Sequence, residues 1–256
     1  MIRSLYTSVS GLISLENKQA VISNNMANAN TNGFKSEELS FKSFKDVMIQ
    51  NKDKIVGGQN VQNKLGKLSL GVAMDNVNTV FTQGNFKETS KAGDFAIDGR
   101  GFFVVQRGSE RLFTRDGNFR VDNDGFLITT TGDNVLGVNR NTGILEPIFV
   151  GNSKFVLHSD RSLDIGGRKT HNLATADFRD YSTLDKIGDN YYKGNNPIYN
   201  ANVTVYQGFI ETSNVNITNE MVNMLTTMRN FETNQKFVSM IDESLGKAAS
   251  EIGAIR

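Results

Sequence analysis

Apolar residues recur at every seventh position along residues 217–256. The series begins at Ile217 and continues without exception through Met224, Phe231, Val238, Leu245 and Ile252. A seven-residue repeat is typical of the seam of a coiled coil. The companion positions are apolar at first and polar in the middle: Met221, Met228, Gln235, Asp242 and Ala249. The pattern predicts a long helix that needs a partner, because the seam side chains alone do not offset the cost of ordering its backbone.

A second amphipathic helix is predicted over residues 4–29. Its apolar side chains fall close to helical spacing, at Leu5, Val9, Leu12, Leu15, Ile22 and Met26. Ser4 can cap this helix, and Gly33 stops it, because Gly adopts positive φ at little cost. The polar face is nearly neutral, which favours a protein partner over a membrane surface. Pairing of the two terminal helices with each other is the simplest solution. The alternative is two ordinary core helices of a globular domain.

Residues 37–81 carry the weakest pattern and are predicted to form a linker. The apolar residues between Phe41 and Met48 are compatible with a short helix, and Gly57-Gly58 opens a polar loop. Residues 68–80 are rich in β-branched side chains and are predicted to be extended.

Residues 82–206 show the alternation and close turns of β structure. A short apolar run, residues 102–105, predicts a buried strand. Four turn sequences predict hairpins: Asp116-Gly117, Asn123-Asp124-Gly125, Gly132-Asp133-Asn134 and Asn141-Thr142-Gly143. The predicted fold class is α+β, with long N- and C-terminal helices pairing as a coiled coil and a central antiparallel β-rich domain. The predicted domains are an N-terminal helix with an Asn/Gly motif at 1–36, a linker at 37–81, the β domain at 82–206 and the C-terminal helix at 207–256.

The composition narrows the choice of partners and sites. Lys and Arg total 28 against 27 for Asp and Glu, so the charge balance gives no reason to expect nucleic acid. The chain has no Cys and only two histidines, His158 and His171, which leaves little for a metal site. No apolar run approaches the roughly 20 residues that a transmembrane helix needs, and the amino terminus lacks a secretory signal pattern. We expect no cofactor, no metal, no nucleic acid and no membrane insertion.

The candidate catalytic patterns are weak. Gly99-Arg100-Gly101 lacks the third glycine of a dinucleotide loop and leads into a strand. For acid pairs such as Asp177 with Asp180, nothing in the sequence places one of the two carboxyl groups in an apolar pocket that would raise its pKa. We therefore expect no enzyme. The enzymatic alternative is a cell-wall hydrolase, which would require a cleft with paired carboxylates.

Both ends of the chain resemble the rod and hook family of the bacterial flagellum. The amino-terminal match consists of Ser10-Gly11-Leu12, Asn24-Asn25-Met26-Ala27-Asn28 and Thr31-Asn32-Gly33-Phe34-Lys35. The carboxy-terminal match includes Gly208, Glu211-Thr212-Ser213-Asn214-Val215-Asn216, Glu220-Met221-Val222-Asn223-Met224 and Arg229-Asn230-Phe231-Glu232-Thr233-Asn234-Gln235-Lys236. In the middle, Asp98-Gly99-Arg100-Gly101-Phe102-Phe103 and Phe113-Thr114-Arg115-Asp116-Gly117 resemble the same family. The family commonly has Gln-Arg and then Tyr where this chain has Met228-Arg229 and Phe231.

The resemblance, which is greatest to distal-rod members, implies a structural subunit that assembles helically into a hollow shaft. The shaft transmits torque from motor to hook and serves as an export channel. The resemblance also implies export by the flagellar type III apparatus, contacts with other rod and hook proteins, and a place in the basal body outside the cytoplasmic membrane. The terminal helices would line the tube, with the β domain outside. Alternatives are a proximal rod or hook-related subunit, and a secreted β binding module with a helical oligomerisation stalk.

We expect the interface between subunits to combine apolar seam residues with asparagines that bond between chains. The seam residues are Leu5, Leu12, Ile22, Met224, Phe231, Val238 and Leu245. The asparagines are Asn24, Asn25, Asn28, Asn214 and Asn216.

Overall fold

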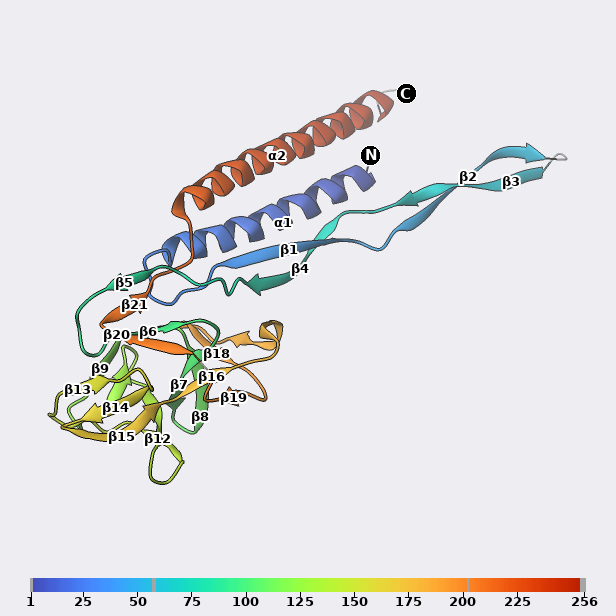
Figure 1. Cartoon of the computed structure of the whole chain (residues 1–256). Helices are drawn as coiled ribbons and strands as arrows, with labels where there is room; N and C mark the ends of the chain where they lie inside the picture. The colour runs from blue at the N-terminus through green and yellow to red at the C-terminus, as the bar shows by residue number, and fades with distance from the viewer. Residues whose placement is uncertain (1, 57–58, 202, 254–256) are drawn as a thin grey trace. The chain divides into compact units, whose positions relative to one another are not determined.

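The chain is divided into two units by its internal contacts. The structure is a computed structural model that describes residues 2–56, 59–201 and 203–253 (Figure 1). Unit 1 is drawn from residues 1–26, 37–78 and 217–256, and unit 2 from residues 27–36 and 79–216. The chain therefore crosses from one unit to the other four times, after residues 26, 36, 78 and 216.

Unit 1 contains the two long helices, and both were predicted from the sequence. Helix α1 spans Ile2–Ala27, and α2 spans Ile217–Gly253. They run alongside each other in opposite chain directions (Figure 1). At 1.5 Å per residue, the 37 residues of α2 form a rod of about 55 Å.

Unit 1 also contains two antiparallel strand pairs that the sequence did not reveal. Strand β1 (Glu37–Ser43) pairs with β4 (Val72–Thr79), and β2 (Val47–Val56) pairs with β3 (Gln59–Leu68). The short helix expected between Phe41 and Met48 is wrong, because short apolar runs fit either period and pairing across the hairpin selects the strand. The extended segment expected at 68–80 is confirmed by β4. The loop expected at Gly57-Gly58 lies outside the described residues.

Unit 2 is built around one large antiparallel sheet. Its main path runs β13-β14-β15-β11-β7-β8-β18-β17, while β9, β10, β12, β16 and β19 pair at its sides. Two further antiparallel pairs, β6 with β20 and β5 with β21, bring the segment after residue 84 beside the segment before residue 212. The first strands are β5 (Phe86–Glu88), β6 (Phe95–Asp98), β7 (Phe102–Arg107), β8 (Glu110–Thr114), β9 (Phe119–Val121), β10 (Leu127–Thr129), β11 (Asn134–Asn139) and β12 (Leu145–Pro147). The later elements are β13 (Phe155–Leu157), β14 (Ser162–Ile165), β15 (Arg168–Leu173), β16 (Thr175–Asp177), the 3-10 turn η1 (Tyr181–Thr183), β17 (Asp185–Lys186), β18 (Tyr191–Lys193), β19 (Ile198–Tyr199), β20 (Thr204–Gln207) and β21 (Phe209–Glu211).

Strand β7 is buried on both faces and separates two apolar cores. Phe103 and Val105 belong to one core, whereas Phe102 and Val104 belong to the other. All four are 0% exposed. Because successive side chains of a strand point to opposite faces, a continuous apolar run marks a strand covered on both sides. The buried strand predicted at residues 102–105 is confirmed.

Three of the four predicted hairpin turns are confirmed. The turns at residues 123–125, 132–134 and 141–143 join antiparallel neighbours, β9 to β10, β10 to β11 and β11 to β12. The prediction for Asp116-Gly117 is wrong, because β9 pairs with β10 and not with β8. A Cβ on Gly117 would lie 1.8 Å from the carbonyl oxygen of Phe95, so this glycine permits a close backbone approach instead.

Candidate functional site

The predicted seam residues of α2 lie on one half-buried face of that helix. Met224, Phe231, Val238 and Leu245 are all of intermediate exposure. The companion row predicted from the sequence does not lie on this half-buried face, because Met221 and Met228 are 50% and 40% exposed. The second row on the half-buried face instead contains Thr227, Asn234, Ile241 and Ala248.

Helix α1 contributes a matching face within unit 1. Ile22 is buried, and Leu5 and Leu12 are half-buried. Gly11 faces α2 so closely that a Cβ added there would lie 3.3 Å from Nδ2 of Asn234. A groove of about 390 Å³ adjoins this contact and is lined by Gly11, Ser14, Leu15, Phe41, Val72, Asn230, Thr233 and Asn234.

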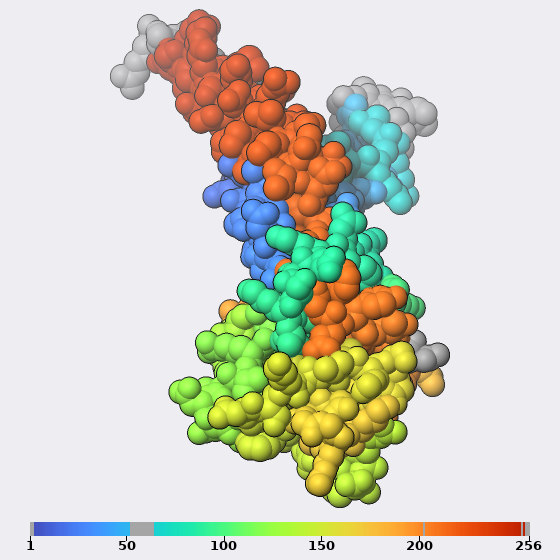
Figure 2. Space-filling view, turned by 60° about the vertical axis from the view of Figure 1, so that its left-hand side comes forward, coloured from blue at the N-terminus to red at the C-terminus, as the bar shows by residue number. Residues whose placement is uncertain are grey.

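The part of the α2 surface that lies away from its half-buried face is open to solvent and carries large apolar side chains. Ile217, the first residue of the helix, is 40% exposed, and six further apolar side chains are between 40% and 57% exposed: Met221, Val222, Leu225, Met228, Phe237 and Met240. We call these six residues the outer stripe. Figure 2 shows the side chains of α2, in orange to red, forming an open surface. A patch of this kind on a helix marks a surface that binds another protein.

Asn25 and Asn214, two of the five predicted interface asparagines, each bond to two backbone groups of their own chain. Asn25 is buried, accepts from the Glu37 N–H at 2.9 Å and donates to the Glu37 carbonyl at 2.9 Å. Asn214 accepts from the Ser36 N–H at 2.8 Å and donates to the Val80 carbonyl at 2.8 Å.

The other three asparagines lie nearer the surface. Asn24 and Asn216 are exposed, and Asn28 is half-buried with its Oδ1 accepting from the Thr31 hydroxyl at 3.2 Å. Bonds from any of the five asparagines to other chains stay a prediction.

A buried cluster of three charged residues lies in unit 2, and sequence reasoning did not find it. Lys35 and Glu211 are 1% exposed and Arg115 is 4% exposed. Lys35 Nζ lies 2.5 Å from Glu211 Oε1, and Arg115 Nη1 lies 3.2 Å from Glu211 Oε2. The Gly84 N–H also donates to Glu211 Oε1 at 2.9 Å. One carboxylate therefore holds two cations and a backbone amide.

The three charges come from the three separate stretches that carry the family resemblance. Lys35 ends the amino-terminal motif, Arg115 lies in the central motif, and Glu211 begins the carboxy-terminal motif. The only sequence feature that pointed to this cluster was the presence of a charged residue in each of the three motifs. No local pattern indicated that these residues meet, since Lys35 and Glu211 are 176 positions apart.

Burial works against the charge on Lys35. Removal from water lowers the pKa of its ammonium group, and the nearby Arg115 lowers it further, while the carboxylate of Glu211 raises it in part. Arg115 also donates to the Gly99 carbonyl at 2.7 Å and lies over the ring of Phe102, 5.4 Å from its centroid. The cluster thus anchors the motifs to the apolar core.

The backbone of Asp116 borders this cluster, and its carboxyl group titrates near neutral pH. Burial raises the pKa of Asp116 to about 6, the nearby carboxylate of Asp94 adds to the rise, and the Asn118 N–H opposes it. Because the folded pKa exceeds the usual 3.8, folding takes up a proton between these two values. This contribution to stability is complete below pH 3.8 and is lost as pH rises through 6.

We expect Asp116→Asn to raise the free energy of unfolding relative to the parent chain by about 1–3 kcal/mol at pH 7.5, and much less at pH 4. The Asn oxygen can still accept the Asn118 N–H, so the turn is preserved. Urea unfolding at both pH values measures the difference, and Asp124→Asn, at an exposed turn, is the control for losing one negative charge. An equal effect of Asp116→Asn at both pH values would contradict the expectation.

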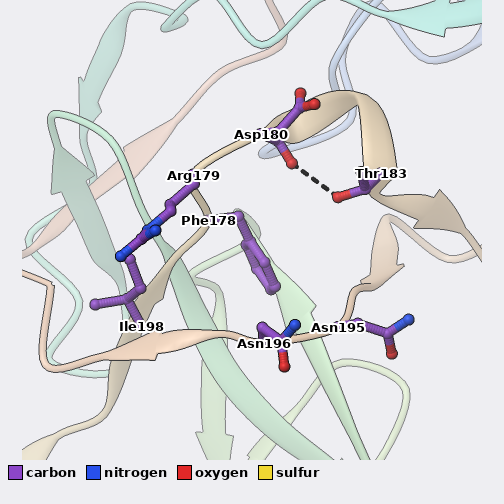
Figure 3. A pocket seen from close by; sticks show the side chains of 7 residues that line it. All are labelled: Phe178, Arg179, Asp180, Thr183, Asn195, Asn196 and Ile198. Atoms are coloured by element: carbon purple, nitrogen blue, oxygen red, sulfur yellow. Dashed lines mark hydrogen bonds between the residues drawn. The ribbon is translucent and has the colours of Figure 1, made fainter.

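A shallow pocket in unit 2 does not have the groups of a catalytic site. Its volume is about 360 Å³, and it is lined by Phe178, Arg179, Asp180, Thr183, Asn195, Asn196 and Ile198 (Figure 3). The Thr183 hydroxyl donates to the Asp180 carbonyl at 2.9 Å, and the Asp180 carboxylate caps η1 through the Ser182 N–H at 2.9 Å. These bonds stabilise a turn, and the pocket has no nucleophile beside a base.

Each of the two histidines lies beside a carboxylate. His171 lies 2.9 Å from Glu146, and His158 lies 3.6 Å from Asp164. Within the described ranges, no group of three or more acidic or histidine side chains is arranged to hold a metal ion. Neither α1 nor α2, which are the long helices of the described chain, has the apolar length needed to cross a bilayer.

Three sequence families match successive parts of the chain. Residues 5–35 match a family described as flagella basal body rod protein, and residues 96–165 match the D1 domain of flagellar hook protein FlgE/F/G. Residues 206–251 match the C-terminal part of flagellar basal body rod FlgEFG proteins. The first and last matches cover most of α1 and α2.

Curated relatives match over nearly the whole chain. The flagellar basal-body rod protein FlgG of Buchnera aphidicola subsp. Schizaphis graminum is 34% identical, over 96% of this chain and 98% of the relative. FlgG of Bacillus subtilis is 33% identical, over 96% and 97%. Among solved structures, the hook protein FlgE2 of Helicobacter pylori matches with a TM-score of 0.23 and 21% identity, over 27% of this chain and 22% of that one.

Proposed function

Because this chain belongs to the flagellar basal-body rod protein family, as a structural subunit of the FlgG type and not an enzyme, we propose that it polymerises through its terminal helices. The basal body is its place in the cell. The proposed polymer is a hollow shaft that transmits torque and serves as an export channel, with the helices inside and the β domain outside. Other rod and hook proteins would adjoin its ends, and the flagellar type III apparatus would export the chain.

The outer stripe of α2 is the observation that carries this proposal. The half-buried face of α2 is turned to its own unit, so the six exposed apolar side chains remain available to neighbours. Full burial of an exposed large apolar side chain contributes roughly 1.5–3 kcal/mol, and these six are already about half covered, so completing their burial supplies roughly 5–10 kcal/mol before the cost of association. Such contacts repeated between copies produce an open helical polymer.

We further propose that α1 and α2 pair as a coiled coil in the shaft. The seven-residue series from Met224 to Leu245 and the close approach at Gly11 support this pairing. The predicted seam residues would then hold the two helices of one subunit together. The outer stripe would hold one subunit to the next.

Electron microscopy and sedimentation of the purified chain test the proposal. We expect the parent chain to form filaments that grow with concentration, and Leu225→Asp combined with Met228→Asp to abolish them, because buried carboxylates would face apolar neighbours. Circular dichroism of the variant monomer should show unchanged helix content, since both positions are exposed.

Asn223→Asp is the control for this variant, because it adds a charge at an exposed polar position of α2 whose neighbours three and four residues away are not in the outer stripe. It should still form filaments. A parent chain that stays monomeric or forms a small closed oligomer would contradict the proposal and favour a binding module with a helical stalk.

A further inference from the structure

The chain crossings between the two units are bonded to one another inside unit 2. The Gly33 N–H donates to the Glu211 carbonyl, the Val80 N–H to the Ser36 carbonyl and the Thr212 N–H to the Asn85 carbonyl, all at 2.8 Å. These bonds link segments 33–36, 80–85 and 211–214, which adjoin the crossings after residues 36, 78 and 216.

Side chains reinforce the same three segments. Glu211 binds Lys35 from the first segment and the Gly84 N–H from the second. Lys35 Nζ also donates to the Thr82 carbonyl at 2.8 Å. Asn214, from the third segment, bonds to Ser36 and Val80. Each segment is therefore held to both of the others by side-chain as well as backbone bonds.

Arg115 connects this network to the β sheet. It binds Glu211 through Nη1 and the Gly99 carbonyl through Nη2, and its backbone continues from β8. A substitution that breaks the bonds of one crossing segment would therefore also affect the bonds of the other two segments and of Arg115.

A gain in folding stability does not by itself explain why Lys35, Arg115 and Glu211 are charged residues. The cluster places two cations beside one carboxylate away from water, and burial outweighs the pull of Glu211 on the pKa of Lys35. Apolar side chains of similar volume often stabilise such a site as well as an ion pair does, whereas a buried pair fixes which groups meet. The geometry indicates a positioning role.

We propose that Lys35, Arg115 and Glu211 tie the crossing segments to one another, so that these segments share any force transmitted between the two units. We call these three residues the joint. The inference rests on the proposed function, because a rod under torque loads every connection between the parts of its subunits. Bonds that are loaded together share the force, whereas bonds on separate segments break one after another. Without the cluster, each crossing segment would be pulled from unit 2 on its own.

Hydrogen exchange on the full-length monomer tests the joint independently of polymerisation. In Glu211→Gln, the amides of Gly33, Val80 and Thr212 should exchange at least about tenfold faster, because two buried cations lose their partner. Amides in the β7 and β8 pair should be unchanged. Arg107→Met is the matched control: it breaks the Arg107–Asp133 pair at 2.9 Å in the same unit and should leave the three amides protected.

Two results would overturn the joint. One is unchanged protection at all three amides in Glu211→Gln, and the other is an equal loss across β7 and β8, which would indicate only general destabilisation. If Glu211→Gln does not fold, Lys35→Met decides the question instead, because it removes one cation of the cluster and leaves Glu211 bonded to Arg115 and the Gly84 N–H.

Filament stiffness separates failure of the joint from failure of the proposed function. Filaments of Glu211→Gln should form with a persistence length several-fold below that of the parent, and filaments of Arg107→Met should match the parent. Equal stiffness in all three would overturn the joint and leave the rod function standing. A parent chain without filaments would refute the polymer, and exchange in the monomer would still decide whether the cluster ties the segments.

Discussion

Gly33→Ala is expected to lower the free energy of unfolding of unit 2 by at least about 3 kcal/mol. Gly33 has φ +65, and a Cβ there would lie 2.4 Å from the Asp116 nitrogen and 2.5 Å from the Arg115 carbonyl carbon. Neither backbone atom can move without disturbing the buried cluster. Tyrosine fluorescence during urea unfolding suits this measurement, because every tyrosine except Tyr6 belongs to unit 2.

Gly143→Ala is the matched control for this substitution. Gly143 has φ +69, nearly the same backbone conformation, but a Cβ there meets nothing within 4 Å. Its cost should be limited to the left-handed conformation, about 1 kcal/mol. Equal losses for the two variants would mean that the close approach of Gly33 to residues 115 and 116 contributes nothing.

Phe231→Asp combined with Val238→Asp is expected to abolish filaments and also to reduce the helix content of the monomer. Both side chains are half-buried on the face of α2 that is turned to its own unit, so two carboxylates there oppose the pairing with α1. A helix of 37 residues with little apolar cover frays, because most helix stability in proteins comes from packing. Circular dichroism and sedimentation measure the two effects.

The outer-stripe pair Leu225→Asp with Met228→Asp provides the contrast. That pair should remove filaments and preserve helix content, whereas the seam pair should reduce both. Full helix content in the seam variant would show that α1 and α2 do not depend on each other in the monomer. Filaments formed by the seam variant would refute the role of the seam in assembly.

The long helices could be predicted because their signal is local. The repeat from Ile217 onward gave α2 its starting residue, and the apolar spacing from Leu5 gave the extent of α1 to within two residues at each end. The second row on the half-buried face of α2 was not predicted, because a row one position earlier than the companion row fits the same repeat and only packing selects between them. The outer stripe was consequently seen only in the structure.

The strands at residues 37–68 and the charged cluster could not be predicted for a different reason. Both depend on residues that meet from distant parts of the chain. The β2–β3 ribbon has few apolar residues in its turn-proximal half, so alternation gave no clear period. Lys, Arg and Glu are almost never fully buried unless paired, so nothing marked Lys35 or Glu211 as core residues before their partner was known.

The sequence separation of Lys35 and Glu211 also has a consequence for the order in which the chain folds. Residues 27–36 belong to a unit whose other part ends at residue 216. Their native contacts with that unit are therefore incomplete until about five-sixths of the chain is present. Contacts of such long range close late and slow folding, because the entropy of a long loop is lost before the contact forms. When the chain emerges amino terminus first, at a ribosome or from a channel, its first motif therefore cannot form its native contacts until most of the sequence has followed.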